Sequence, residues 1–155
     1  MSEKYEFDSV DYEILSILQN DARTPYLEIA RKLIVSGGTV HQRIDKMKQA
    51  GIILGSKLVL DTKKLGLDVT VFLGIHLTDS SVLDDVLEAM RKIKEITEVH
   101  YTTGSYGLLI KIQTKTIGDF HQLLINKLQQ IRGIRATESF ISLDNPIYRE
   151  VPLTR

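Results

Sequence analysis

Side chains able to contact nucleic acid gather in the stretch from Ser36 to Lys46. Apolar residues recur through it at the spacing of one helix face, namely Val40, Ile44 and Met47. The side chains expected to project from the opposite face are Thr39, Gln42, Arg43 and Lys46. Gln42 and Arg43 are able to make paired hydrogen bonds to adenine or guanine edges. The stretch predicts a helix in the major groove of duplex DNA, its base-contacting end formed by Ser36, Gly38, Thr39, Gln42 and Arg43.

Two short helices joined by a tight turn are expected to position these side chains. Thr24 can cap a helix whose first residue is Pro25, and Ser36 can cap the next one. The inward stripe expected for the first of these helices is Leu27, Ala30, Leu33 and Ile34. Gly51 supplies a left-handed end for the second. Residues 24–53 therefore predict the second and third helices of a helix-turn-helix.

The sign of the charge changes within this region. Residues 1–30 hold two basic and seven acidic side chains, whereas residues 31–57 hold six basic side chains and a single aspartate. The basic residues expected to contact phosphates are Arg31, Lys32, Lys46, Lys48 and Lys57. A basic patch on an acidic domain favours nucleic-acid binding. A solvated face of a small helical bundle is the alternative that the pattern leaves open.

Composition restricts the other classes of function. The 155 residues balance twenty basic against twenty acidic side chains and contain no cysteine, which excludes disulfides, zinc ribbons and thiol nucleophiles. The four histidines lack metal-ligand spacing, and the GSYG turn lacks the lysine of a phosphate loop. No signal peptide or membrane-spanning run is apparent, so we expect a cytoplasmic protein without a membrane partner. We also expect no enzymatic activity, cofactor or metal.

A further helix and a wing are expected to complete the first domain. Asp8 or Ser9 can cap a helix that ends near Asn20. Its inward stripe is Val10, Ile14, Ile17 and Leu18. Residues 53–61 suggest the short strand pair of a winged helix-turn-helix. We therefore expect an N-terminal DNA-binding domain at residues 1–61 and, because it is charged and contains glycine, a linker at 62–68.

The pattern after residue 68 is that of an α+β domain, expected at residues 69–155. The elements expected in order are a strand at 69–77, a helix at 83–93, strands at 99–103 and 108–114, a helix at 120–131 and a strand at 134–143. This is the order of the ferredoxin-like βαββαβ fold, in which two helices cover one face of a four-stranded antiparallel sheet. The other face is expected to be covered by a second copy in a homodimer, and a half-polar, solvated sheet is the alternative.

A helix-turn-helix followed by a ferredoxin-like domain resembles the Lrp/AsnC family of amino-acid-responsive transcription regulators of bacteria and archaea. The resemblance covers nearly the whole chain, and the stretches that carry it are VDYEILSILQNDARTPYLEIA, SGGTVHQRIDKMKQAGII, YTTGSYGLLIKI, LINKLQQI and NPI. Within the family, the chain is most similar to the AsnC branch. The resemblance implies that double-stranded DNA is a partner and that homodimers assemble into an octamer.

The resemblance also implies an amino acid effector, with asparagine as the first to test, bound in the ferredoxin-like domain where dimers meet. The residues that it indicates are Tyr101, Thr102, Thr103, Gly104, Tyr106 and Gly107 at the hairpin turn and Thr137 and Glu138 of the last strand. Backbone amides and hydroxyls suit a carboxylate there, and Glu138 suits an ammonium group. A plain hairpin turn without a ligand and an architectural DNA-compacting protein without a ligand response are the alternatives.

Three positions depart from the family's pattern. Ile34 stands where many members have glycine between the two helices, and it is expected to resist a left-handed backbone and so to change the shape of the turn. Gly37 stands where proline often follows the capping serine. Gly107 replaces an aspartate of the hairpin turn, which places the identity of the effector and the response to it in question.

Overall fold

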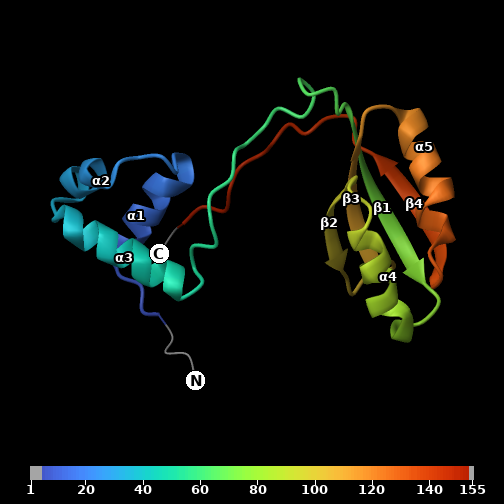
Figure 1. The fold of residues 1–155 in the computed structure, drawn as a ribbon, viewed down its shortest axis with the longest axis horizontal. Coiled ribbons are helices and arrows are strands. Elements are labelled where there is room, and N and C mark those ends of the chain that lie inside the picture. The colour runs from blue at the N-terminus through green and yellow to red at the C-terminus, as the bar shows by residue number, and fades with distance from the viewer. Residues whose placement is uncertain (1–4, 154–155) are drawn as a thin grey trace. The chain divides into compact units, whose positions relative to one another are not determined.

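The computed structural model describes residues 5–153 and divides the chain into two compact units (Figure 1). The helical unit extends to Val59 and includes the segment from Ile147 onward, and the sheet unit covers Leu60–Pro146. The expected boundaries at residues 61 and 69 differ from this division, most of all at the C-terminal end. Residues after Pro146 group with the helices, and Gln19 Nε2 donates a hydrogen bond to the Val151 carbonyl at 3.1 Å.

Three helices form the helical unit. Their bounds are α1 Ser9–Asn20, α2 Tyr26–Leu33 and α3 Gly37–Gln49. Asp8 caps α1 as predicted, and its carboxylate and that of Asp11 each accept a hydrogen bond from the other residue's amide. The buried side chains of the core come from all three helices and are Ile14, Ile29, Ala30, Val40, Ile44 and Met47. The predicted helix-turn-helix is therefore confirmed.

The inner face of α2 differs from the prediction. Leu27 is 66% exposed and Ile34 is 93% exposed, so the prediction that both face inward is wrong. Ile29 and Ala30 are the buried residues of this helix. Ile29 lies one position from Ala30 and two from Leu27, so the apolar stripe is rotated about the helix relative to the predicted one.

The start of α2 also differs from the prediction. The helix begins at Tyr26, and Pro25 occupies the capping position without a side-chain hydrogen bond. Thr24 Oγ1 donates to the Asp21 carbonyl at 2.8 Å instead of capping the helix. Thr24 lies one residue before the capping position, so its hydroxyl stabilises the preceding turn and not the amides of α2.

The turn between α2 and α3 contains a left-handed residue. Ile34 has φ 56° and ψ 46°, and its amide donates to the Ala30 carbonyl. The Val35 amide donates to the same carbonyl at 3.0 Å, which closes the end of α2 in the manner usual for glycine. The expected change in the shape of the turn is therefore wrong, because Ile34 adopts the left-handed backbone itself. Its β-branched side chain makes this conformation cost about 1–3 kcal/mol.

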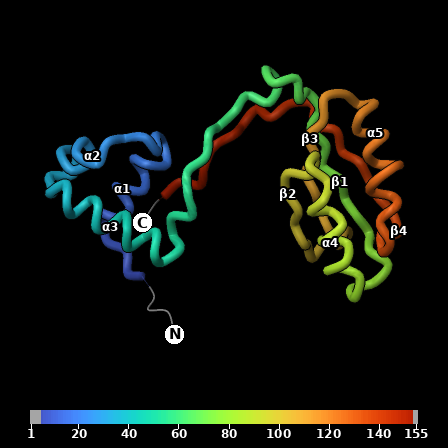
Figure 2. Tube along the Cα trace, in the orientation of Figure 1, coloured from blue at the N-terminus to red at the C-terminus, as the bar shows by residue number. Residues whose placement is uncertain are grey.

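The predicted wing is absent from the structure. Residues 53–68, all of them described, contain no strand, and the chain there is an extended segment followed by turns (Figure 2). Leu54, Leu58 and Val59 are exposed, so no other element packs on their side chains. A strand requires backbone partners, and this segment has none of strand type within the described part of the single chain.

The sheet unit has the predicted ferredoxin-like order of elements. Its strands are β1 Val69–Leu77, β2 Ile96–Tyr101, β3 Leu108–Thr114 and β4 Ile134–Ile141. Its helices are α4 Leu83–Arg91 and α5 Ile117–Asn126, with single 3₁₀ turns at Ser80–Val82 and Leu128–Gln130. The strands pair antiparallel in the order β2-β3-β1-β4. The α+β fold class is thereby confirmed.

Alternation along the central strands separates the core from the open face. Val71, Leu73 and Ile75 of β1 are fully buried, and they oppose Ile112, Ile110 and Leu108 of β3 in register. Helices α4 and α5 pack on this one face through side chains that include Val86, Met90, Phe120 and Leu123. The opposite face carries Phe72 and Phe140, which are paired across β1 and β4 and are 38% and 44% exposed. This exposed aromatic face is the one predicted to meet a second copy.

Helix α5 is shorter than the sequence pattern suggests. Leu128 and Ile131 lie beyond its end at Asn126, in a 3₁₀ turn and the residue after it. Leu128 is nevertheless fully buried. Gly133 has φ 101° and makes the left-handed turn into β4.

Candidate nucleic-acid interface and effector site

The N-terminal end of α3 is exposed and capped by Ser36. Ser36 Oγ accepts a hydrogen bond from the Thr39 amide at 3.0 Å and lies 2.8 Å from Thr39 Oγ1, so these two polar side chains already contact each other. Gly38, Gln42 and Lys46 are exposed on the same helix. The predicted base-contacting residues therefore share one solvent-facing surface, with the exception of Arg43.

Arg43 does not project away from the helical unit. Its Nη1 lies 2.9 Å from Asp11 Oδ1 and 2.7 Å from Asp8 Oδ2, and its side chain is 28% exposed. Arg43 follows Val40 by three residues and precedes Met47 by four, so it belongs to the edge of the buried stripe. The prediction that Arg43 faces outward is wrong for this geometric reason. We interpret Arg43 as a residue that orients α3.

Electrostatics hold this contact in its charged form. The hydrogen bonds to Asp11 and then to Asp8 raise the pKa of Arg43. The pKa of Asp8 is lowered, first by the hydrogen bond from the Asp11 amide and then by the Arg43 guanidinium. Asp11 is 1% exposed, so its carboxylate has lost its hydrogen bonds to water. The Arg43 guanidinium and the Asp8 amide donate to it in their place. We call Asp8, Asp11 and Arg43 the α1–α3 ion pair cluster.

The role of Asp11 was missed by the sequence reasoning, although a signal was present. Asp11 precedes Ile14 by three residues and Leu18 by seven, so it falls on the apolar stripe of α1. A charged residue at such a position is buried only when it is paired. Arg43, on the stripe of α3, is the matching partner.

The basic side chains near α3 have different surroundings. Lys32 Nζ lies 2.9 Å from Glu28 Oε1, and both side chains are about half exposed. Arg31, Lys46 and Lys48 are exposed. His41 pairs with Asp45 at 3.2 Å one turn along the same helix. The exposed part of α3 therefore carries basic and amide groups, as the charge pattern predicted.

Hydrogen bonds within the hairpin fix the turn between β2 and β3. The Thr102 amide donates to the Gly107 carbonyl at 3.1 Å, and Thr102 Oγ1 donates to the Tyr106 carbonyl. The Gly107 amide donates to the Ile75 carbonyl at 2.9 Å, which ties the turn to β1. Thr103 and Gly104 lie at the exposed tip. Two of the predicted effector-binding groups, the Thr102 hydroxyl and the Gly107 amide, are thus already hydrogen-bonded within the protein.

Tyr106 lies on the open face of the sheet. Its ring rests on Gly74, where an added Cβ would come within 2.6 Å of ring carbon Cδ1, and it meets His76 and Phe140 edge-on at centroid distances of 5.2 and 6.2 Å. Its hydroxyl donates to Glu138 Oε2, which raises the pKa of Tyr106. Tyr106 and Glu138 therefore lie on the exposed aromatic face. The hydroxyl of Tyr106 and one carboxylate oxygen of Glu138 are already hydrogen-bonded to each other.

A cavity of about 310 Å³ lies beside the turn. The predicted residues that line it are Tyr101, Thr102 and Gly107, together with Ser105 of the same turn. Arg135 of β4 and Asp79, which follows β1, line it as well. The Ser81 hydroxyl and amide donate to Asp79 Oδ1, and these bonds lower the pKa of Asp79. The cavity thus brings together a cation and an anion that the sequence reasoning did not assign.

Comparison with known proteins identifies the chain. The family model for the AsnC-type helix-turn-helix domain matches residues 7–48, and the model for the Lrp/AsnC ligand binding domain matches residues 70–152. The regulatory protein AsnC of Haemophilus influenzae is 44% identical over 147 residues, which cover 95% of this chain and 98% of that protein. The chain belongs to the Lrp/AsnC family. Regulatory protein AsnC of Escherichia coli is 43% identical over 149 residues, covering 96% and 98%.

Solved structures agree with this membership. The structure of E. coli AsnC superimposes with a TM-score of 0.92 at 42% identity and covers 96% of this chain and 99% of that one. A transcriptional regulator of Neisseria meningitidis in complex with L-Met shares the fold, with a TM-score of 0.88 at 19% identity and coverage of 93% and 94%. The chain is therefore an AsnC-type transcription regulator with a ligand-binding domain and not an enzyme, as predicted. No helix within residues 5–153 is long and apolar enough to span a membrane.

Proposed function

We propose that this AsnC-type regulator binds a specific duplex DNA site through α3 and that an amino acid in the cavity beside the β2–β3 turn changes its DNA affinity. The observation that carries the proposal is the presence of a cation and an anion, Arg135 and Asp79, in the lining of one small cavity of a family ligand-binding domain. Arg135 suits the carboxylate of an amino acid. Asp79 Oδ1 is used by Ser81, but Oδ2 accepts only one longer bond, from Thr78 at 3.3 Å, and can also accept from an ammonium group.

Side chains of α3 are proposed to contribute to DNA binding in three ways: by contacting bases, by contacting phosphates and by orienting the helix. Gln42 is exposed on α3 and suits a base edge, whereas Lys46 and Lys48 suit phosphates. Arg43 orients α3 and does not contact DNA itself, because its guanidinium is bound to Asp8 and Asp11. The other residues predicted to contact DNA are Arg31, Lys32, Ser36, Gly38 and Thr39, and their role stays a prediction.

A homodimer through the exposed aromatic face would present two copies of α3. Phe72 and Phe140 supply apolar area to such an interface, and Tyr106 fills the space above Gly74. A two-fold dimer prefers a nearly palindromic site with half-sites about one helical turn apart. Assembly of dimers into an octamer and a cytoplasmic location, where chromosomal DNA is found, complete the proposal.

The effector is proposed to be a zwitterionic amino acid, and asparagine is the first to test. The cavity is lined by groups of both signs, as a zwitterion requires. Binding would shift DNA affinity through a coupling free energy of about 1–3 kcal/mol. Thr103, Gly104, Tyr106, Thr137 and Glu138 were also predicted to bind the effector, and of these Tyr106 and Glu138 are hydrogen-bonded to each other.

The DNA part of the proposal is tested by selecting a duplex site and measuring affinity across salt concentrations. We expect Gln42→Ala to cost about 1–3 kcal/mol on the selected site and to relax preference at one base pair. Lys46→Ala should weaken binding to all sequences alike and reduce the salt slope by about one unit. Lys64→Ala, 85% exposed in the sheet unit, is the control and should change neither. Equal affinity of Gln42→Ala and wild type for the site would contradict the α3 assignment.

The effector part is tested by calorimetric titration with each of the twenty amino acids, with and without DNA. Saturable binding that Arg135→Ala weakens and that alters DNA affinity would support the proposal. Binding of DNA with little sequence preference and without any effect of amino acids would favour the alternative, an architectural DNA-compacting protein.

A further inference from the structure

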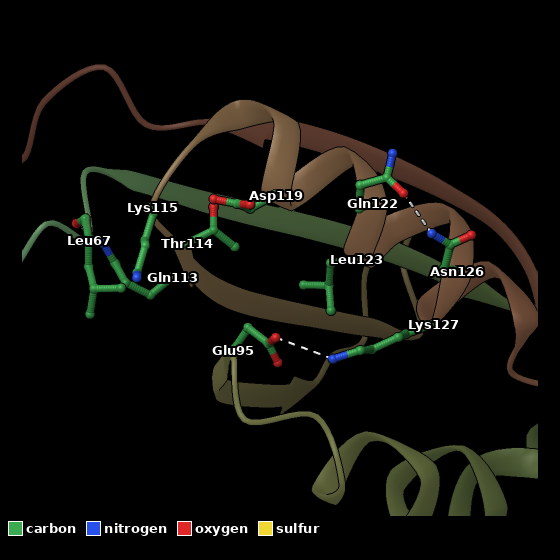
Figure 3. A pocket seen from close by; sticks show the side chains of 10 residues that line it. All are labelled: Leu67, Glu95, Gln113, Thr114, Lys115, Asp119, Gln122, Leu123, Asn126 and Lys127. Atoms are coloured by element: carbon green, nitrogen blue, oxygen red, sulfur yellow. Dashed lines mark hydrogen bonds and ion pairs between the residues drawn. The ribbon is translucent and has the colours of Figure 1, made fainter.

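A second cleft, lined by charged, amide and apolar side chains, lies on the helix side of the sheet unit, away from the β2–β3 turn. It measures about 470 Å³ and is formed by the end of β3, the outer face of α5 and the loop before β2 (Figure 3). None of its lining residues lines the cavity beside the turn. It therefore differs from the site proposed above for the effector.

Glu95 presents an unsatisfied charge in this cleft. Its Oε1 lies 3.3 Å from Lys127 Nζ, whereas its Oε2 is buried and has no hydrogen-bond partner among the residues that the structure describes. The pKa of Glu95 is lowered, first by a hydrogen bond from its own backbone amide and then by Lys127. The carboxylate thus has its own amide and Lys127 as donors, but its buried Oε2 receives no hydrogen bond from another described residue. A buried carboxylate that is only partly satisfied is costly, so Glu95 is suited to receive a further donor.

The rest of the cleft offers the opposite charge and a rigid frame. Lys115 follows β3 directly, is exposed and lies beside Gln113 in Figure 3. Two hydrogen bonds fix Gln113 in place. Its backbone amide donates to the Glu95 carbonyl at 2.9 Å, and its side-chain Nε2 donates to the Leu67 carbonyl at 2.6 Å. Leu123, nearly buried, supplies an apolar wall.

The charges of the cleft balance one another. Glu95 and Asp119 oppose Lys115 and Lys127. Asp119 Oδ2 already accepts from the Thr116 amide and hydroxyl at 3.1 and 2.8 Å, so Asp119 is occupied with capping α5. Asp119 is thus committed to the cap of α5, whereas Glu95 is the acid with a buried oxygen that receives no donor from another described residue. Lys115 is the base at the opposite side of the cleft. A simple anion or a simple cation would satisfy only one of the two.

We propose that this cleft is a second small-molecule site of the regulator, and that it takes a zwitterionic α-amino acid. The ammonium group donates to the carboxylate of Glu95, whose side chain is 36% exposed. The ligand carboxylate meets Lys115, and its side chain lies along Leu123. The site stands on its own residues, so it does not depend on the proposed role of Arg135. Each protomer would then hold two amino acids of independent affinity.

The test is calorimetric titration of the full-length protein with L-asparagine and the other amino acids, using variants that disable one site at a time. Wild type is expected to take up two equivalents per protomer, and Arg135→Ala is expected to retain one. Adding Glu95→Gln or Lys115→Met to Arg135→Ala should weaken the retained binding about tenfold or more, the loss expected for a charged hydrogen bond. Glu88→Gln on α4, paired with Lys92 outside the cleft, is the matched control and should have no effect.

Two additions keep the result decisive. Asn126→Trp fills the cleft from the exposed face of α5 without removing a charge, so it should block binding even if Glu95→Gln disturbs folding. Succinamic acid, which is asparagine without its amino group, should bind wild type but not Arg135→Ala, if its carboxylate alone suffices at the turn. Amino acid binding abolished by Arg135→Ala and untouched by the cleft variants would overturn this proposal and leave the effector site at the turn standing. Binding that is lost only through the cleft variants would support the cleft site and overturn the effector site at the turn. No binding by any amino acid would overturn both proposals.

Discussion

The helical unit and the sheet unit stabilise their folds in different ways. Among residues 5–153, twelve buried apolar side chains fill the core of the sheet unit, whereas six do so in the helical unit. Because apolar burial is the dominant favourable term in folding, the sheet unit has the larger reserve of stability. The helical unit adds a buried carboxylate, Asp11, bound to Arg43.

The difference bears on function. Apolar packing has no preferred direction, but a hydrogen-bonded ion pair holds its two partners at a fixed geometry. The orientation of α3 relative to α1 therefore depends on few groups, and a small change at Asp11 should reach the DNA-contacting face. In the sheet unit, the core is a scaffold that carries the cavity beside the β2–β3 turn and the cleft beside α5.

The largest expected effect is in the sheet core. Ile110 is fully buried at the centre of β3 and opposes Leu73 and Val99 on the neighbouring strands. Ile110→Ala should destabilise the sheet unit by about 3–4 kcal/mol through lost burial and the cavity left behind. Hydrogen exchange followed by mass spectrometry measures each unit separately. Ile117→Ala, 59% exposed at the start of α5, is the control and should cost far less. A comparable loss in the helical unit would show that the two units do not unfold independently.

The next effect separates the helical unit from the sheet unit. Asp11→Ala leaves Arg43 with Asp8 as its remaining partner, and the Arg43 side chain is 28% exposed. Removing one member of a fully buried pair costs about 3–5 kcal/mol, and partial exposure reduces our expectation to about 2 kcal/mol. Exchange should rise in α1 and α3, with no change in the sheet unit, and affinity for the selected DNA should fall. Asp45→Ala, which removes an exposed pair with His41, is the matched control.

The same comparison explains what the sequence could predict. The bounds of β1 agree with the prediction at both ends, because alternation is a local signal wherever one sheet face is buried. The bounds of β3 also agree with the prediction, and α4 begins at the predicted residue, because its apolar residues recur at helical spacing. These elements rely on apolar burial, which the spacing of residues in the sequence records directly.

Features that depend on distant partners were not predicted. Arg43 has the residue type of a base-contacting side chain, and only the position of Asp11 across α1 decides its role. Residues 53–61 have the composition of a wing, but a strand needs a partner that the described chain does not supply. Arg135 and Asp79 are far apart in sequence and meet at one cavity because β4 pairs with β1. Neither Arg135 nor Asp79, considered alone in the sequence, indicates a binding site.

A smaller effect is expected from the turn of the helix-turn-helix. Ile34 is 93% exposed and has φ 56°, so its side chain contributes little packing while its backbone is strained. Ile34→Gly should raise the stability of the helical unit by about 1 kcal/mol, since glycine adopts this conformation without the Cβ clash. Leu54→Gly is the matched control, because Leu54 is 94% exposed and is not among the residues with positive φ. A loss of stability in Ile34→Gly would mean that Ile34 makes a contact in the assembled protein.

The smallest effect is a difference in the acid response of the two units. Asp8 caps α1 and Asp79 caps the 3₁₀ turn before α4, and the pKa of each carboxyl is lowered. The hydrogen bond from the Asp11 amide is the main cause for Asp8, and hydrogen bonds from Ser81 are the main cause for Asp79. A carboxyl whose pKa is lowered by folding stabilises the fold above its unfolded pKa, near 3.8, and that stability is lost as pH falls through the folded pKa. Asp8→Asn should therefore flatten the stability loss below about pH 4 in the helical unit alone, and Asp79→Asn in the sheet unit alone, as followed by exchange in each unit. If either variant changed the acid response of both units, the two units would unfold together at low pH. Their stabilities could then not be compared separately under acidic conditions.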